Sequence, residues 1–62
     1  MNFKEMNKDN TSFEEFKKAC YERAKQEPDV KYALECISDE SEMECLYSHG
    51  TSVDSTVYLM AY

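Results

Sequence analysis

The stretch that decides the fold is TSFEEFKKACYERAKQ, residues 11–26. Its apolar residues recur at spacings of three and four along the chain: Phe13, Phe16, Cys20 and Ala24. Charged side chains occupy most of the remaining positions. This periodicity predicts an amphipathic helix with one face toward a core and the other toward solvent.

Both ends of this helix are marked in the sequence. Thr11 and Ser12 each have a glutamate three residues later, which is the capping-box pattern of a helix N-terminus. Pro28 disfavours helical geometry at Glu27, so we expect the helix to end near Gln26.

A second helix is expected over residues 28–37. Its apolar residues also follow helical spacing: Val30, Ala33, Leu34 and Ile37. Pro28 is acceptable at the first helical position, and Asp29 beside it suits the positive end of the helix dipole.

A third helix is expected after residues 38–41, because the serines and the aspartate there compete for backbone hydrogen bonds and favour a break. Ser41 and Glu44 form another capping box. The positions expected to face inward are Met43, Leu46 and Tyr47. Gly50 would end this helix in a left-handed turn.

Residues 53–62 allow two interpretations. A helical stripe is formed by Val53, Val57, Met60 and Ala61, with Ser52 or Asp54 as its cap. The same stretch is rich in β-forming residues and could pair with residues 43–47 as a hairpin. The chain has one glycine and one proline, and so few turn residues favour the helix.

These patterns predict an all-α fold, a small single-domain bundle of three to four short helices. The alternative is an α+β fold of two helices followed by a C-terminal β-hairpin. We expect residues 11–62 to form one small acidic domain. Residues 1–10 would form a polar, flexible N-terminal segment, unless Phe3 and Met6 fold back on the core.

The size of the chain favours a function at the surface. A domain of 62 residues buries only about 60% of the surface that its unfolded chain exposes. A ligand pocket of about 300 Å³ would consume most of such a core. His49, the only histidine, adjoins Gly50 at an expected helix end, where it suits a capping role better than a catalytic one. We therefore expect no enzyme and no cofactor.

Several other classes of site are disfavoured. Cys20, Cys36, Cys45 and His49 lack the close pairing of structural zinc ligands, so no metal site is expected. Three cysteines without a secretion signal indicate reduced thiols and a cytoplasmic protein. No apolar stretch is long enough for a membrane span. Direct nucleic-acid binding is not expected, because acids are interleaved with every basic stretch.

The negative charge is confined to the second half of the chain. Residues 1–31 hold seven acids and all seven bases, whereas residues 32–62 hold six acids and no base. Such asymmetry indicates a partner selected by charge. The carboxylates predicted to form an acidic face against a basic surface are Glu35, Asp39, Glu40, Glu42 and Glu44. Alternatively, they only favour a helix N-terminus and solubility.

Tyrosines of the same half are predicted to join this contact: Tyr47, Tyr58 and Tyr62. Tyrosine combines a large apolar area with a hydrogen-bonding tip, which is typical of protein interfaces. The other interpretation is that these rings fill the core.

We therefore expect a small acidic protein-interaction module that binds a larger protein with a basic surface and inhibits or modulates it. In size and charge the chain is similar to the small early proteins by which bacteriophages take over host machinery, a resemblance of composition that includes no motif. One alternative is a DNA mimic that inhibits a nucleic-acid-binding protein. Another is a structural helical homodimer, since self-association often completes the core of so short a chain.

Overall fold

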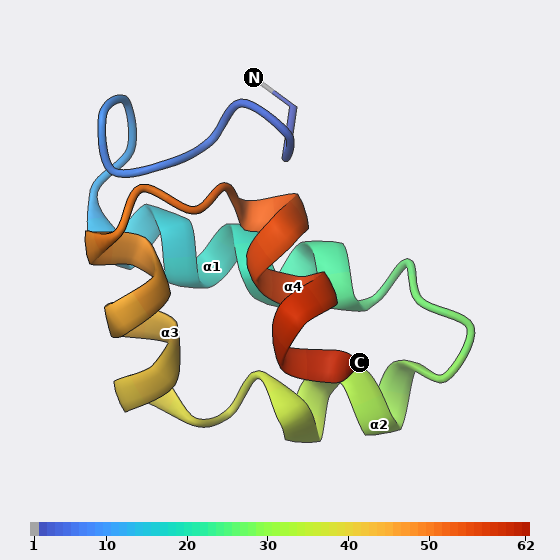
Figure 1. Ribbon diagram of the computed structural model, residues 1–62. Helices are drawn as coiled ribbons and strands as arrows, with labels where there is room; N and C mark the ends of the chain where they lie inside the picture. The colour runs from blue at the N-terminus through green and yellow to red at the C-terminus, as the bar shows by residue number, and fades with distance from the viewer. Residues whose placement is uncertain (1) are drawn as a thin grey trace.

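The chain forms four short helices in its computed structural model, which describes residues 2–62 (Figure 1). The helices are α1 (Phe13–Ala24), α2 (Val30–Cys36), α3 (Glu40–Ser48) and α4 (Val53–Ala61). The described residues contain no strand. The all-α prediction is confirmed, and the alternative C-terminal hairpin is wrong.

Each helix begins at a short polar side chain that accepts a hydrogen bond from the backbone N–H three residues later. The four N-caps are Ser12, Asp29, Asp39 and Ser52. Such caps satisfy one of the N–H groups that a first helical turn leaves without a partner. The sequence allowed Thr11 or Ser12 as the cap of the first helix and Ser52 or Asp54 as the cap of the last. The structure uses Ser12 and Ser52.

Two predicted boundaries are wrong because an aspartate takes the cap. Asp29 accepts from the Tyr32 N–H at 3.0 Å, so α2 begins at Val30 and Pro28 precedes the cap. Asp39 accepts from the Glu42 N–H at 3.2 Å, so α3 begins at Glu40 and not at the expected Ser41–Glu44 box. A carboxylate at this place also interacts favourably with the helix dipole, an advantage that a serine hydroxyl lacks.

α1 and α3 end with different backbone conformations. α1 ends at Ala24, two residues before the expected Gln26, because the backbone tightens there: the Gln26 N–H bonds to the Arg23 carbonyl three residues back. At the end of α3, Gly50 has φ of +87°. Thr51 N–H bonds back to Leu46, and the glycine N–H to Tyr47, as in a Schellman motif.

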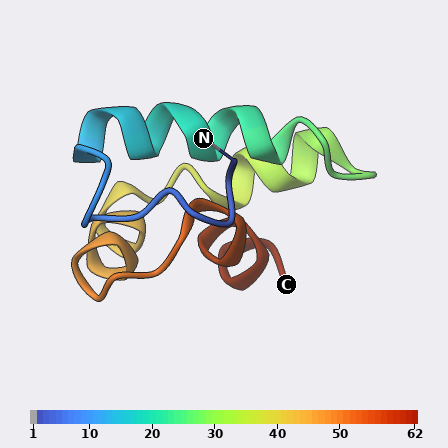
Figure 2. The ribbon, with the colours of Figure 1, turned by 90° about the horizontal axis from the view of Figure 1, so that it is seen from above.

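The core is built from all four helices. Its buried members are Phe16, Ala19, Cys20, Ala24, Ala33, Ile37, Met43, Val53 and Val57. Figure 2 shows α1 side-on along one side of the molecule, with α3 and α4 seen nearly end-on beside it. α1 packs against each of the other helices, and α4 packs against α1, α2 and α3. These two helices therefore organise the packing.

Residues 2–10 fold back on this core. Phe3 and Met6 lie half-buried against it, and their carbonyls accept hydrogen bonds from the first two N–H groups of α4, at Asp54 (3.1 Å) and Val53 (2.9 Å). The Ser52 hydroxyl accepts from the third, at Ser55, and the Ser52 carbonyl accepts the first regular bond of the helix, from Thr56. The N–H groups of Val53, Asp54 and Ser55, which have no partner within the helix, are thereby satisfied, and the N-terminal segment supplies two of these three bonds, so it helps to position α4.

One buried polar group has no hydrogen-bond partner within residues 2–62. The Thr56 hydroxyl on α4 is fully buried, and its oxygen is unpaired. A buried hydroxyl without a partner loses its bonds to water and regains nothing.

Thr56→Val should stabilise the protein by about 1 kcal/mol, because valine has the same shape and no polar atom to desolvate. Urea unfolding followed by circular dichroism measures the change. Thr51→Val, at a half-buried position outside the helices, is the control and should give no such gain. A loss of stability in Thr56→Val would mean that the hydroxyl contributes to the fold.

Candidate functional site

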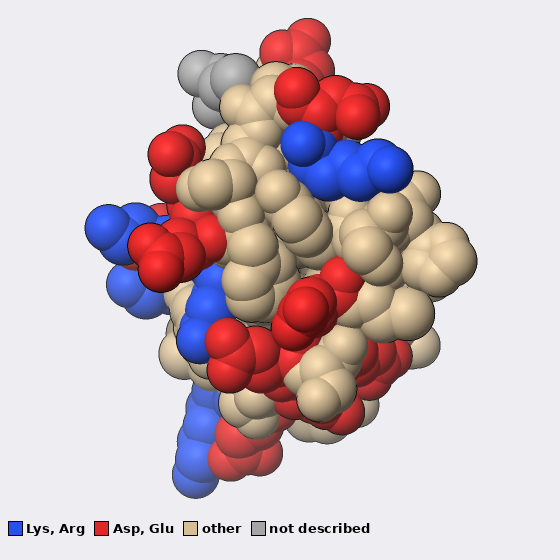
Figure 3. Space-filling model, turned by 90° about the vertical axis from the view of Figure 1, so that its left-hand side faces the viewer, with Lys and Arg blue, Asp and Glu red and all other residues tan. Residues whose placement is uncertain are grey.

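The predicted carboxylates are distributed over α2, α3 and the loop between these two helices. Figure 3 shows acidic side chains gathered over the lower part of the α3 side of the molecule, with basic side chains along the border where α1 lies. Glu42 and Glu44 are two residues apart on α3, so they point about 200° apart around its axis. They therefore flank the exposed side of α3 and do not form one tight cluster.

The bases of the first half reach only part of this acidic surface. Lys17 on α1 pairs with Glu40 at 3.1 Å, and both side chains are exposed. An exposed pair of this kind contributes at most about 1 kcal/mol. Within residues 2–62, Glu35, Glu42 and Glu44 form no ion pair, and Asp39 is used as a cap. The region around α3 therefore remains negative.

Tyr47 lies among core side chains. Its ring packs on Phe13 and Phe16, with centroids 5.3 and 4.9 Å away. Its hydroxyl donates to the Thr11 carbonyl at 2.7 Å, which joins the end of α3 to the start of α1. Of the three predicted tyrosines, this one has a structural role.

Tyr58 and Tyr62, by contrast, are directed outward. Their side chains are 63% and 69% exposed, and Leu59 between them is 55% exposed. The two rings lie 5.5 Å apart, so they form one continuous surface with the leucine. The sequence pattern alone did not indicate a surface role for Leu59. Once residues 53–61 are known to be helical, its spacing places it beside the two tyrosines.

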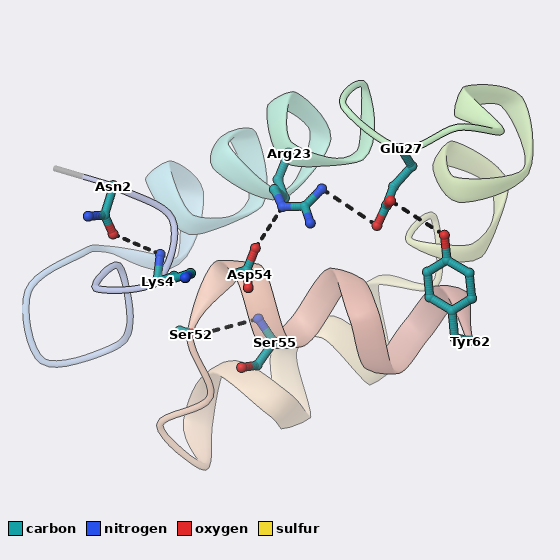
Figure 4. A network of polar contacts seen from close by, with 8 residues as sticks. All are labelled: Asn2, Lys4, Arg23, Glu27, Ser52, Asp54, Ser55 and Tyr62. Carbon is teal, nitrogen blue, oxygen red and sulfur yellow. Dashed lines mark hydrogen bonds and ion pairs between the residues drawn. The ribbon is translucent and has the colours of Figure 1, made fainter.

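A polar network joins α1 to α4 and reaches Tyr62, one member of this aromatic surface (Figure 4). Arg23 on α1 bonds to Asp54 on α4 at 2.7 Å and pairs with Glu27 at 3.5 Å. Tyr62 donates its hydroxyl hydrogen to Glu27 at 3.4 Å. The bond to Asp54 raises the pKa of Arg23, although partial burial opposes this. Arg23 and Asp54 are 31 residues apart, and no sequence pattern indicated that they would meet.

The three cysteines do not converge on a site. Cys20 is buried, Cys36 half-buried and Cys45 exposed. Within residues 2–62, no three side chains of histidine, cysteine, aspartate or glutamate come together in a group that could hold a metal ion. Burial raises the pKa of the Cys20 thiol to about 12.

Two shallow surface hollows lie beside the N-terminal segment. One, of about 450 Å³, is lined by Asn2, Phe3, Lys4, Arg23, Gln26 and Asp54. The other, of about 490 Å³, is lined by Phe3, Met6, Glu15, Lys18, Ala19 and Glu22. Neither is lined by a cysteine, serine or histidine, the residues of a nucleophile and base pair.

No protein-family model, no curated protein and no solved structure matches this chain significantly. Among the helices of the described residues, none combines the length and the apolar character needed to cross a membrane.

The burial of the thiols predicts a clear order of reactivity. At pH 8, iodoacetamide should modify Cys45 first and Cys20 last, because only the thiolate reacts and Cys20 is both enclosed and held protonated. Mass spectrometry of peptides taken at timed intervals gives the three rates. Modification of Cys20 as fast as Cys45 in the folded protein would contradict the buried position, and unfolding in urea should remove the difference.

The same shift of the Cys20 pKa makes stability depend on pH in a defined direction. The unfolded thiol ionises near pH 9.0, whereas the folded one stays protonated up to about pH 12. Its contribution to stability is therefore full below pH 9 and is lost as the pH rises between these two values.

The two kinds of tyrosine should respond differently to truncation. Tyr47→Ala should cost about 2–3 kcal/mol of stability, because it removes a packed ring and a buried hydrogen bond. Tyr58→Ala, at an exposed position, should change stability by no more than about 0.5 kcal/mol. Urea unfolding of both variants tests this contrast. Equal losses would show that Tyr58 belongs to the core.

Proposed function

We propose that this chain is a small protein-interaction module that binds a larger protein with a basic surface and inhibits or otherwise modulates it. The observation that supports this proposal best is the exposed surface of Tyr58, Leu59 and Tyr62, on a molecule in which Glu42 and Glu44 form no ion pair with residues 2–62. Apolar area for contact and negative charge for selection are thereby combined in one small domain.

The exposed tyrosines suit binding for a thermodynamic reason. A tyrosine presents a large, rigid surface with few rotatable bonds, so its immobilisation costs little entropy. Its hydroxyl can keep a hydrogen bond when the ring is covered. Tyr58 and Tyr62 are not needed to fill the core, because the core of α4 is completed by Val53 and Val57 on the opposite side.

The acidic surface would act on the approach of the partner. Exposed charges attract a basic surface over about one Debye length and disfavour acidic competitors. Their effect should therefore be strongest on the association rate and should decrease as salt is added.

The arrangement of the carboxylates favours a general interaction module over the DNA-mimic alternative. A mimic presents its carboxylates along one face in place of phosphates. Here Glu42 and Glu44 lie on opposite flanks of α3, and Glu40 is paired with Lys17.

Charge reversal on α3 tests the proposal. The doubly substituted variant Glu42→Lys with Glu44→Lys should lose most of the partner captured by the wild-type protein from a lysate of the source cells, because it converts an attractive surface into a repulsive one. Quantitative mass spectrometry of the captured proteins, at low and at physiological salt, gives the measurement.

The matched control is Glu5→Lys with Glu14→Lys, which changes the net charge equally at exposed positions that form no ion pair in residues 2–62. This control should retain the partner. Equal loss in both double variants, or none in either, would reject a role for the acidic surface of α3. Circular dichroism must show that each variant is folded.

A further inference from the structure

The outside of α4 differs from that of an ordinary surface helix. Ser55, Tyr58, Leu59 and Tyr62 follow the spacing i, i+3, i+4 and i+7, so they share one stripe of the helix, and all four are exposed. We call this stripe the α4 outer face. No residue from Ser55 to Tyr62 is charged. A helix that covers a core normally presents charged side chains to water on this side.

By contrast, the exposed sides of the other long helices are charged. On α1 the residues facing water include Glu14, Lys18 and Glu22, and on α3 they include Glu40 and Glu44. The neutral, aromatic stripe is therefore specific to α4. A stripe of apolar residues at this spacing is the pattern with which one helix docks against another.

The charges around the α4 outer face are predominantly negative. In the network that reaches Tyr62, one cation, Arg23, faces two carboxylates, Glu27 and Asp54. The pKa of Tyr62 is raised, first by loss of hydration and then by Glu27; Arg23 opposes the increase, and the charge of Asp29, the exposed cap of α2, adds a smaller one.

Tyr32 on α2 lies next to the Asp29 cap, whose side chain accepts a hydrogen bond from the Tyr32 N–H. It is 51% exposed. Its pKa is raised, first by its hydrogen bond with Cys36, and the charges of Asp29 and Tyr62 add smaller increases. Lys31, the only base of α2, lies about 100° around the helix from Tyr32.

We propose that the α4 outer face docks a basic amphipathic helix of another protein. This inference rests on the proposed function and assigns the contact to a place in the fold. The apolar side of the partner helix packs on Tyr58 and Leu59. Its lysine or arginine side chains reach Asp29 and the faces of the tyrosine rings, where cations bind favourably.

Charge complementarity selects this occupant over a second copy of the chain. Two α4 outer faces packed together would each bring two carboxylates, Glu27 and Asp54, against one cation, Arg23, so neither copy would supply the missing positive charge. Juxtaposed like charges oppose such a pairing. A basic helix supplies both the apolar stripe and the missing positive charge.

Three synthetic peptides of 18 residues provide defined probes. The first is an amphipathic leucine–lysine helix. The second keeps its apolar face and replaces each lysine by glutamate, and the third keeps the lysines and replaces each leucine by serine. Binding is measured by fluorescence anisotropy, and its site is mapped by amide chemical shifts of the labelled protein. We expect saturable binding of the leucine–lysine peptide alone, with shifts centred on residues 27–32 and 55–62.

Three variants separate the contributions. Tyr58→Ser with Leu59→Ser should weaken binding at least tenfold, because central apolar contacts contribute most of the affinity. Val30→Ser, at an exposed apolar position about 200° around α2 from Tyr32, is the control and should bind as the wild type does. Asp29→Asn removes a charge but keeps an equally good cap, so it should weaken binding a few-fold and reduce its salt dependence.

Four results would overturn the inference. The first three are absence of saturable binding, shifts centred on α3, and equal binding of the glutamate peptide. The fourth is a concentration-dependent shift of residues 55–62 without peptide, which would identify a second copy as the occupant. If one of these occurs while capture from lysate remains sensitive to Glu42→Lys with Glu44→Lys, the proposed function stands and only this location fails. If the capture is insensitive as well, the proposed function fails with it.

Discussion

Val53 and Val57 lie fully buried in one cluster with Phe16 and Met43, and this contact places α4 at the centre of the fold. α4 carries apolar residues on more than one side. The core of a chain of 62 residues is too small to bury more than one face of this helix. Burying the valines therefore turns Tyr58, Leu59 and Tyr62 toward solvent. The exposed aromatic surface is thus a direct consequence of how this small core is filled.

The N-terminal segment is part of the same constraint. Its carbonyls at Phe3 and Met6 accept the first two N–H groups of α4, and its apolar side chains cover the core beside α1. A helix of nine residues is too short to be stable by itself in water. The bonds from residues distant in sequence hold the start of α4, and the Arg23–Asp54 pair adds a second link to α1.

Folding neutralises part of the charge asymmetry between the two halves of the chain. In the sequence, the second half has acids and no base. In the structure, bases of α1 pair with Glu40 and Asp54 of this half, whereas Glu42 and Glu44 have no basic partner among the described residues 2–62. Part of the imbalance is therefore used to attach the two halves to each other. The remaining part is available at the surface, and it lies close to α3.

The sequence by itself indicated the helical class of the protein and its first three helices, because apolar spacing and capping residues are local properties of the chain, but it left residues 53–62 open between a helix and a strand. It also gave the inward position of Met43 and the turn at Gly50. Only the tertiary structure showed which of the candidate residues cap each helix. It also placed Tyr47 in the core and Tyr58 and Tyr62 at the surface, and it brought Arg23 into contact with Asp54. These outcomes depend on which residues distant in sequence become neighbours, and periodicity along the chain contains no information about that.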